Sequence, residues 1–428
     1  MNYILLNKQI KNYKNNKEWE LLLSTYVWII ILMLGPIVSP YFMLVSFTIQ
    51  IYRLLRYNLN NALMDIVFTM PFLSMYKAPN GDILLVYYIL VFNIVFLLKR
   101  HSFRYNSSLV IMYISFLYFI LRIGDKYTTP IFICGGMFFL YLTLTNHFNF
   151  KFEKILKLFC LSTVISSSYA LITIKFFNIS YTNINLKGRF AGVFIDPNYY
   201  SIFLLLSLIS LIVLKSDNKI QSVFFYLEFI SLALFGALTG SKSFFLFFLL
   251  IIFYQIMELI NKRKFFKIFF LILFLFFSLT YIERENIGIF ELVLKRLNTV
   301  KDVNSLTTGR LNIWTNYIKY IFSDIKVILF GKGLDNLLLG RSTHNIILET
   351  IYNCGIIGLF LIIMFFISIL FNLKRYYIRY KKISILSYFP IYSVLTLYLF
   401  LQGIATVEFY LLMFISFICF CLFPKKNN

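Results

Sequence analysis

Two neighbouring stretches decide the fold: Phe244–Ile260, with the sequence FFLFFLLIIFYQIMELI, and Phe265–Tyr281, with the sequence FFKIFFLILFLFFSLTY. Each is close to the length that an apolar helix needs to cross a hydrocarbon core of about 30 Å. Only helices and closed barrels cross a bilayer, and these runs are too long and too continuously apolar for barrel strands. The sequence therefore predicts an all-α membrane protein.

The composition of the whole chain supports the same fold class. Of its 428 residues, 60% are apolar and only 14% are charged, whereas soluble domains have roughly 45–50% and about 25%. A soluble protein has too little interior to bury that much apolar surface. We therefore expect residues 1–428 to form a single integral membrane domain.

Apolar runs separated by basic gaps predict about twelve to fourteen transmembrane helices. Breaks at Pro36, Pro40 and Pro71 make the first three helices the shortest. The expected ranges are 21–35, 38–52, 62–76, 83–98, 107–123, 130–146, 155–177, 199–214, 221–239, 243–260, 265–281, 346–371, 383–402 and 404–423.

The distribution of Lys and Arg indicates the orientation, because cytoplasmic loops carry an excess of positive charge. When the N-terminus is placed in the cytoplasm, the basic clusters alternate with gaps that have few cations. The short outer gaps then hold Lys77, Lys126, Lys187, Arg189 and Lys242. This pattern predicts a multi-pass protein with both termini in the cytoplasm. The net charge of +23 is thus explained by topology, and no basic face with interleaved aromatics indicates nucleic-acid binding.

Two outer segments, 178–198 and 282–345, are longer than simple connections between helices. Long ordered loops often carry function. The larger one contains amphipathic stretches at Ile289–Leu297 and Leu311–Phe322, which suit short helices on the membrane surface. We expect 178–198 to be an extracytoplasmic loop and 282–345 to be the large extracytoplasmic loop.

One histidine, His344, falls on the predicted outer face, at the end of the large loop and the start of a long helix. Ser342 or Thr343 can cap that helix. Near a helix N-terminus the charged form of an imidazole is disfavoured, so the neutral ring is available as a base. His344 is therefore a candidate catalytic residue.

Four cations share the outer face with this histidine: Arg189, Lys242, Arg310 and Arg341. The planar fork of arginine suits phosphate oxygens, and glycines beside these residues let backbone approach an anion. Beside a bilayer, such a set suits a lipid-linked phosphate or diphosphate. No histidine, cysteine or carboxylate spacing indicates a metal site.

The run from His344-Asn345 through nine residues to Gly355 and Gly358 resembles the signature of the O-antigen ligase and polymerase family of bacterial membrane glycosyltransferases. Glycines spaced i, i+3 in the following helix allow close helix packing at the site. The similarity extends over about residues 180–370.

Two arginine segments add to this resemblance. GRFAGVFIDPN, with Arg189, is similar to the family's first outer-loop arginine segment, and TTGRLNIW, with Arg310, is similar to its second. GKGL at Gly331–Leu334 matches a glycine-rich turn. Lys242 stands in TGSKS where many relatives have arginine, and lysine lacks the planar fork.

The resemblance implies a polymerase that joins undecaprenyl-diphosphate-linked oligosaccharides into O-antigen or capsule chains at the outer face of the bacterial cytoplasmic membrane. His344 would be the general base, and Arg189, Arg310, Lys242 and Arg341 would bind the diphosphate. The reaction would invert the anomeric centre and need no metal or cofactor. Besides membrane lipids, a flippase and a chain-length regulator would be partners.

Two alternatives stay open from the sequence alone. A ligase, which transfers the glycan to lipid A-core, would use the same donor and the same residues. A polysaccharide flippase or other transporter would also have many spans and would use ionisable residues within them, such as Asp65, Glu228 and Glu349. Outer-face cations and a long outer loop favour an enzyme, because transport needs polar sites near the bilayer midplane.

Overall fold

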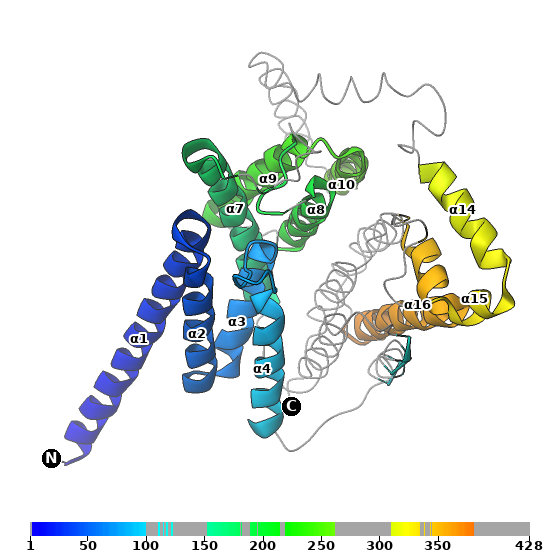
Figure 1. Ribbon diagram of the computed structural model, residues 1–428. Helices are drawn as coiled ribbons and strands as arrows, with labels where there is room; N and C mark the ends of the chain where they lie inside the picture. Colours follow the sequence, from blue (N-terminus) through cyan, green and yellow to red (C-terminus); the bar gives the residue numbers. More distant parts are fainter. Residues whose placement is uncertain are drawn as a thin grey trace.

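The computed structural model describes residues 2–99, part of 110–122, 152–179, 181, 189–194, 196–214, 219–261, 310–333, 338, 343 and 345–380. These residues fold almost entirely as helices (Figure 1). The helices are α1 (Asn2–Val38), α2 (Tyr41–Arg56), α3 (Leu59–Thr69), η1 (Met70–Phe72), α4 (Leu84–Lys99), α7 (Phe152–Phe177), α8 (Pro197–Val213), α9 (Lys219–Leu238), α10 (Lys242–Asn261), α14 (Arg310–Phe322), α15 (Ile325–Phe330) and α16 (Ile346–Tyr380).

The helical fold class is confirmed for this part of the chain, and the predicted ranges for α7 to α10 agree with the structure to within one turn. The expected break at Pro36 is wrong, because α1 runs through this residue to Val38. Pro36 lies two residues before the end of α1, so only the last residues of the helix follow the amide bond that it cannot make. Pro40 does mark a boundary, at the N-cap of α2, and Pro71 lies in η1, which ends α3.

Within the part of the chain that the structure describes, three helices are long and apolar enough to cross a membrane, over Trp19–Val38, Lys154–Phe177 and Ile347–Met364. Shorter apolar helices occur within α4, α8, α9 and α10. The predicted spans at 130–146, 265–281, 383–402 and 404–423 lie outside the described residues.

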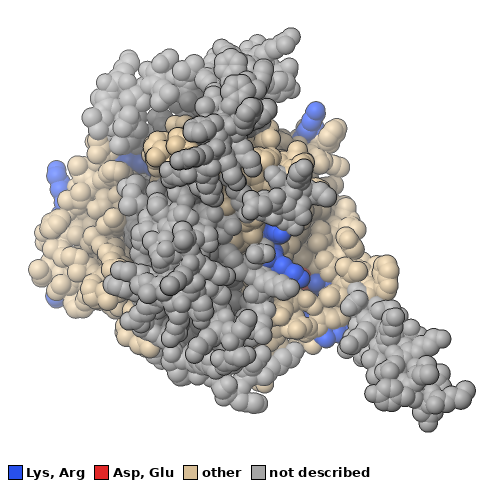
Figure 2. All heavy atoms as spheres, turned by 180° about the vertical axis from the view of Figure 1, so that it is seen from behind, with Lys and Arg blue, Asp and Glu red and all other residues tan. Residues whose placement is uncertain are grey.

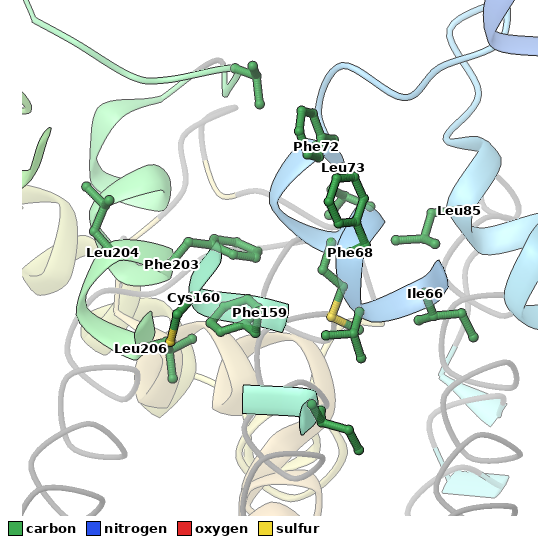
Figure 3. Packing of buried hydrophobic residues seen from close by; sticks show 14 of the residues in the cluster. Ile66, Phe68, Phe72, Leu73, Leu85, Phe159, Cys160, Phe203, Leu204 and Leu206 are labelled. Atoms are coloured by element: carbon green, nitrogen blue, oxygen red, sulfur yellow. The ribbon is translucent and has the colours of Figure 1, made fainter. Parts of the chain in front are cut away.

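The helices α1 to α4 and α7 to α10 share one apolar core. Figure 3 shows its centre, where Phe68 and Phe72 from α3 and η1 approach Phe159 from α7 and Phe203 from α8. The ring centroids of Phe68 and Phe72 are 5.6 Å apart, and those of Phe159 and Phe203 are 6.3 Å apart. Aromatic pairs therefore contribute to the packing of η1 on α3 and of α8 on α7.

A buried ion pair joins the first three helices of the bundle. The Arg53 guanidinium donates through Nε and Nη2 to the two carboxylate oxygens of Asp65, each at 2.9 Å. Its Nη1 also donates to the Leu21 carbonyl oxygen at 3.1 Å and to Ser24 Oγ at 2.6 Å. Both charged side chains are almost completely buried, so each needs the other to offset its lost hydration.

Asp65→Ala is expected to lower the free energy of unfolding by about 3–5 kcal/mol, because it leaves the Arg53 charge buried without its counterion. Thermal unfolding of the purified protein in detergent measures the change. Glu20→Ala is the control, since it breaks the exposed pair with Arg56 and should leave the melting temperature nearly unchanged. Equal shifts for the two variants would contradict the assigned importance of the buried pair.

The helices α14 to α16 form a second packed group. Tyr317 and Ile321 of α14 and Tyr352 of α16 make a small apolar cluster, in which the rings of Tyr317 and Tyr352 are 4.8 Å apart. The helix α14 coincides with the amphipathic stretch expected at Leu311–Phe322, and the other stretch, Ile289–Leu297, lies outside the described residues.

Candidate functional site

Arg189 bridges two segments that are far apart in the sequence. Its Nε donates to the Thr239 carbonyl oxygen at 2.8 Å, and its Nη2 donates to Asn198 Oδ1 at 3.0 Å. Beside it, the Phe190 amide donates to the Leu238 carbonyl oxygen at 3.0 Å. The guanidinium is therefore fixed between the first turn of α8 and the end of α9.

The turn between α9 and α10 brings the TGSKS segment against Arg189. Gly240 has a φ of +56°, and a Cβ built there would lie 3.8 Å from Arg189 Nε. Ser241 lies just before α10, and its Oγ accepts the Phe244 amide at 3.4 Å. Lys242 is the first residue of α10; its side chain is outside the description. The structure thus places the Arg189 side chain and the Lys242 backbone at the same turn.

Two helix N-termini meet the Arg189 region. The helix α8 begins after Asp196, whose Oδ1 accepts the Asn198 amide at 2.7 Å, and α10 begins after Ser241. A helix N-terminus carries a partial positive charge and unpaired amides. Together with the guanidinium, the two N-termini suit an anion, and the Asp196 carboxylate and the Ser241 hydroxyl each already accept one first-turn amide.

The Arg189 loop is anchored by aromatic packing. The Phe190 ring lies edge-on to Tyr200, with centroids 5.6 Å apart, and the Tyr200 hydroxyl is hydrogen-bonded to Ser167 of α7. Gly192 has a φ of +57°, and a Cβ there would lie only 2.6 Å from the Tyr200 ring. Gly192 therefore lets the loop turn closely over α8, and the arginine position follows from that packing.

A second cluster forms around the residues that flank His344. Trp314 Nε1 of α14 donates to the Thr343 carbonyl oxygen at 2.8 Å. Thr343 Oγ1 accepts the Asn345 amide at 3.0 Å and lies 3.3 Å from a carboxylate oxygen of the buried Glu349. The residue before His344 is therefore held by both α14 and α16.

The N-cap of α16 is Asn345. Its Oδ1 accepts the amides of Ile347 at 3.0 Å and Leu348 at 3.3 Å, so the expected cap by Ser342 or Thr343 is wrong. Thr343 instead braces the Asn345 amide. The side chains of threonine and asparagine can both cap a helix. Thr343 does not cap α16 because the hydrogen bond from Trp314 holds it before the first turn.

Arg310 begins α14 and lies one turn before Trp314 on the same side of the helix. Side chains spaced i, i+4 are neighbours, about 5–6 Å apart at Cβ. Because Trp314 reaches Thr343, the face of α14 that carries Arg310 is directed towards the segment around His344. His344 and Arg341 themselves lie outside the described residues.

The signature glycine Gly355 interrupts α16. Its φ of +70° and ψ of −177° are non-helical, a conformation that is essentially restricted to glycine. A Cβ there would lie 2.1 Å from the Leu329 carbonyl oxygen of α15. The helix therefore kinks where it meets α15, whereas the sequence indicates an unbroken helix; Gly358, also buried, lies in the continuing helix.

The backbone carbonyl groups just before this kink accept hydrogen bonds from other segments. The Lys332 amide donates to the Tyr352 carbonyl oxygen at 2.7 Å, and the Gly333 amide donates to that of Asn353 at 2.9 Å. The Tyr118 hydroxyl donates to the Cys354 carbonyl oxygen at 2.6 Å. Arg122 Nη2 donates to the Gly331 carbonyl oxygen at 2.6 Å, and neither Tyr118 nor Arg122 had a sequence signal for this role.

The candidate residues therefore fall into two groups. Arg189 and the start of α10 form one, and Arg310 with the residues around His344 forms the other; Figure 1 shows α8 to α10 and α14 to α16 in different parts of the molecule. No protein-family model, curated protein or solved structure matches the chain. The assignment of these residues to one reaction thus rests on their chemistry and on the sequence resemblance.

Within the described residues, no group of three or more His, Cys, Asp or Glu side chains is arranged to hold a metal ion. The candidate binding residues near the turn between α9 and α10, Arg189 and Lys242, are cations. Near His344, the carboxylate of the buried Glu349 is hydrogen-bonded to Thr343. Metal independence stays a prediction of the sequence resemblance.

Proposed function

We propose that the protein is a membrane glycosyltransferase that polymerises lipid-diphosphate-linked oligosaccharide units at the outer face of the bacterial cytoplasmic membrane. The proposal includes the multi-pass topology of about twelve to fourteen spans, cytoplasmic termini and the large outer loop. The observation that carries it is the guanidinium of Arg189, fixed between the first turn of α8 and the backbone just after α9, at the ends of apolar helices.

This arrangement suits the charge that develops when a glycosyl diphosphate bond breaks. Negative charge grows on the diphosphate as it leaves, and a preorganised cation with helix N-termini stabilises that charge without reorganising. The apolar helix α10 exposes Leu246, Leu249 and Phe253, which would give the lipid tail a surface beside the same turn. Arg189 would bind the diphosphate there, joined by Lys242.

The second group supplies the base in this mechanism. A hydroxyl of the acceptor sugar attacks the anomeric carbon, and the bond from that carbon to the diphosphate oxygen breaks. The hydroxyl proton passes to the neutral imidazole of His344, and the lipid diphosphate leaves with the bonding electrons. Arg341, which lies three residues before His344 in the chain, and Arg310, on the helix that Trp314 joins to Thr343, would contact the same diphosphate.

For catalysis the two groups must share one substrate. The carbon that the acceptor attacks is bonded to the diphosphate, so the mechanism requires His344 and Arg189 to meet at one reaction centre when the substrate is bound. The hydrogen bond between Trp314 and Thr343 supports a shared role for Arg310 and His344, because it joins the Arg310 helix to the segment that flanks His344. Aromatic and amide side chains near a sugar are usual binding groups.

Arg189→Lys tests the proposal, because it keeps the charge and removes the planar fork that reaches both Thr239 and Asn198. We expect product formation to fall by about 10²–10³-fold, as when one preorganised charge-stabilising donor is lost. The surface glycan profile of cells with this variant as the only copy measures the effect, beside wild type and a full deletion at matched membrane levels.

The matched control is Arg56→Lys, at an exposed arginine paired with Glu20, which should keep a normal glycan ladder. Near-normal chain length in Arg189→Lys would remove Arg189 from the site. A deletion that leaves one repeat unit on the acceptor supports a polymerase, whereas complete loss of acceptor-linked glycan indicates a ligase. Units trapped on the inner leaflet would indicate a transporter.

A further inference from the structure

The corner where α14 meets α15 exposes four apolar side chains, which we name the corner patch: Phe322, Ile325, Leu329 and Phe330. The exposed fractions of Phe322, Ile325 and Phe330 are 72%, 68% and 45%. On α15 the buried side chain is Val327, on the side facing the rest of the group. The apolar side chains of the corner patch thus point away from the packed interface.

Lysines border the corner patch. Lys319, Lys326 and Lys332 are all exposed, and the one carboxylate between residues 318 and 333 is that of Asp324. Asp324 caps α15 by accepting the Lys326 amide at 2.8 Å. The patch therefore combines exposed apolar side chains with a net positive charge.

The charge of Lys332 is stabilised locally. Its Nζ lies 5.3 Å from the centroid of the Tyr320 ring, and its hydrogen bond with Tyr320 raises the pKa of the ammonium above its usual range. This lysine is therefore cationic at neutral pH. On the face shown in Figure 2, the coloured charged side chains of the described residues are Lys and Arg, with no Asp or Glu visible.

The corner patch is attached rigidly to a candidate membrane span. The hydrogen bonds from Lys332 and Gly333 reach the carbonyl oxygens of Tyr352 and Asn353, which lie inside the apolar window Ile347–Met364 of α16. The backbone of Leu329 lies against Gly355 in the same window. The corner patch is thus held beside the part of α16 that enters the membrane.

We propose that the corner patch docks into the membrane surface, with its apolar side chains among the acyl chains and its lysines on the phosphates of anionic phospholipids. Exposed apolar groups bordered by lysines match the two layers of a lipid surface, apolar below and anionic above. Continuity with α16 favours lipid over a soluble partner. Through Trp314, docking would also hold the Thr343–Asn345 segment at a constant height over the bilayer.

The test places a bimane fluorophore at Phe330→Cys in the full chain, with the five native cysteines replaced by alanine. The protein is reconstituted into vesicles of phosphatidylcholine, with or without phosphatidylglycerol. We expect brominated phospholipid to quench this label several-fold more strongly than aqueous iodide does. The control is the same label at Asn316→Cys, an exposed position on another side of α14, which iodide should quench instead.

Lys326→Gln and Lys332→Gln test the headgroup contact. Each should weaken docking about fivefold in vesicles with phosphatidylglycerol, and neither should change it in phosphatidylcholine alone. If the cysteine-free chain does not fold, the same labels are measured in the native-cysteine chain, with the unsubstituted chain as the blank.

Two results would overturn the proposal. Quenching of Phe330→Cys by iodide would place the corner patch in water. Protection from both quenchers would show that another segment or a second copy of the chain covers it. Because the label reports only on lipid contact, a failure here leaves the glycosyltransferase proposal untouched, and a failure of that proposal leaves this one standing.

Discussion

Cells whose only copy carries His344→Ala are expected to show the surface glycan profile of the deletion strain, with the protein at its normal membrane level. A general base typically contributes about 10²–10⁴-fold to a rate. The flanking residues are held by hydrogen bonds of Trp314, Thr343 and Asn345. The start of α16 should therefore survive the substitution, so that a lost ladder reports lost chemistry.

The matched control is His147→Ala, a histidine in a predicted cytoplasmic gap, which should leave the ladder unchanged. Membrane levels are compared by immunoblotting, and folding by size-exclusion chromatography in detergent. A normal glycan ladder in His344→Ala cells would make His344 a structural residue at the helix end. The proposed mechanism would then fail, and a transporter would become the better hypothesis.

Helix positions were the most predictable feature of the chain. Runs of Phe, Leu and Ile bounded by Lys, Asn and Pro locate α7 to α10 to within one turn, because burial in lipid or in a helical core needs a long apolar segment. Proline was less informative: Pro36 lies inside α1, whereas Pro40 begins α2. Whether a proline ends a helix depends on how the rest of the fold compensates for the hydrogen bond that its missing amide cannot make, and a single sequence does not show that.

The candidate site was predictable only at the level of residue type. The partner of Arg189 is the carbonyl oxygen of Thr239, and a backbone oxygen has no signature in the sequence. The cap of α16 moved from Thr343 to Asn345 because Trp314 and Glu349 hold Thr343 outside the helix. Such choices follow from tertiary contacts between segments far apart in the chain.

The largest structural effect is expected from Gly355→Val. The backbone at this position has a φ of +70° and a ψ of −177°, which a β-branched residue does not adopt without strain. A Cβ would also lie 2.1 Å from the Leu329 carbonyl oxygen, so α15 and α16 must separate. Strain and overpacking together should cost about 4 kcal/mol.

Cys354, buried next to this glycine, reports the change directly. In a chain with the other four cysteines replaced, a loss of about 4 kcal/mol should raise the maleimide labelling rate of Cys354 by about a thousandfold. Gly81→Ala is the control, because Gly81 also has a positive φ of +91° but nothing lies within 4 Å of its Cβ position. Gly81→Ala introduces backbone strain but no steric collision, and Gly81 is far from Cys354 in the sequence. The labelling of Cys354 should therefore stay slow in this variant. Equal labelling of Cys354 in Gly355→Val and in the parent chain would mean that α15 does not rest on α16, and the corner patch would lose its rigid attachment to the membrane span.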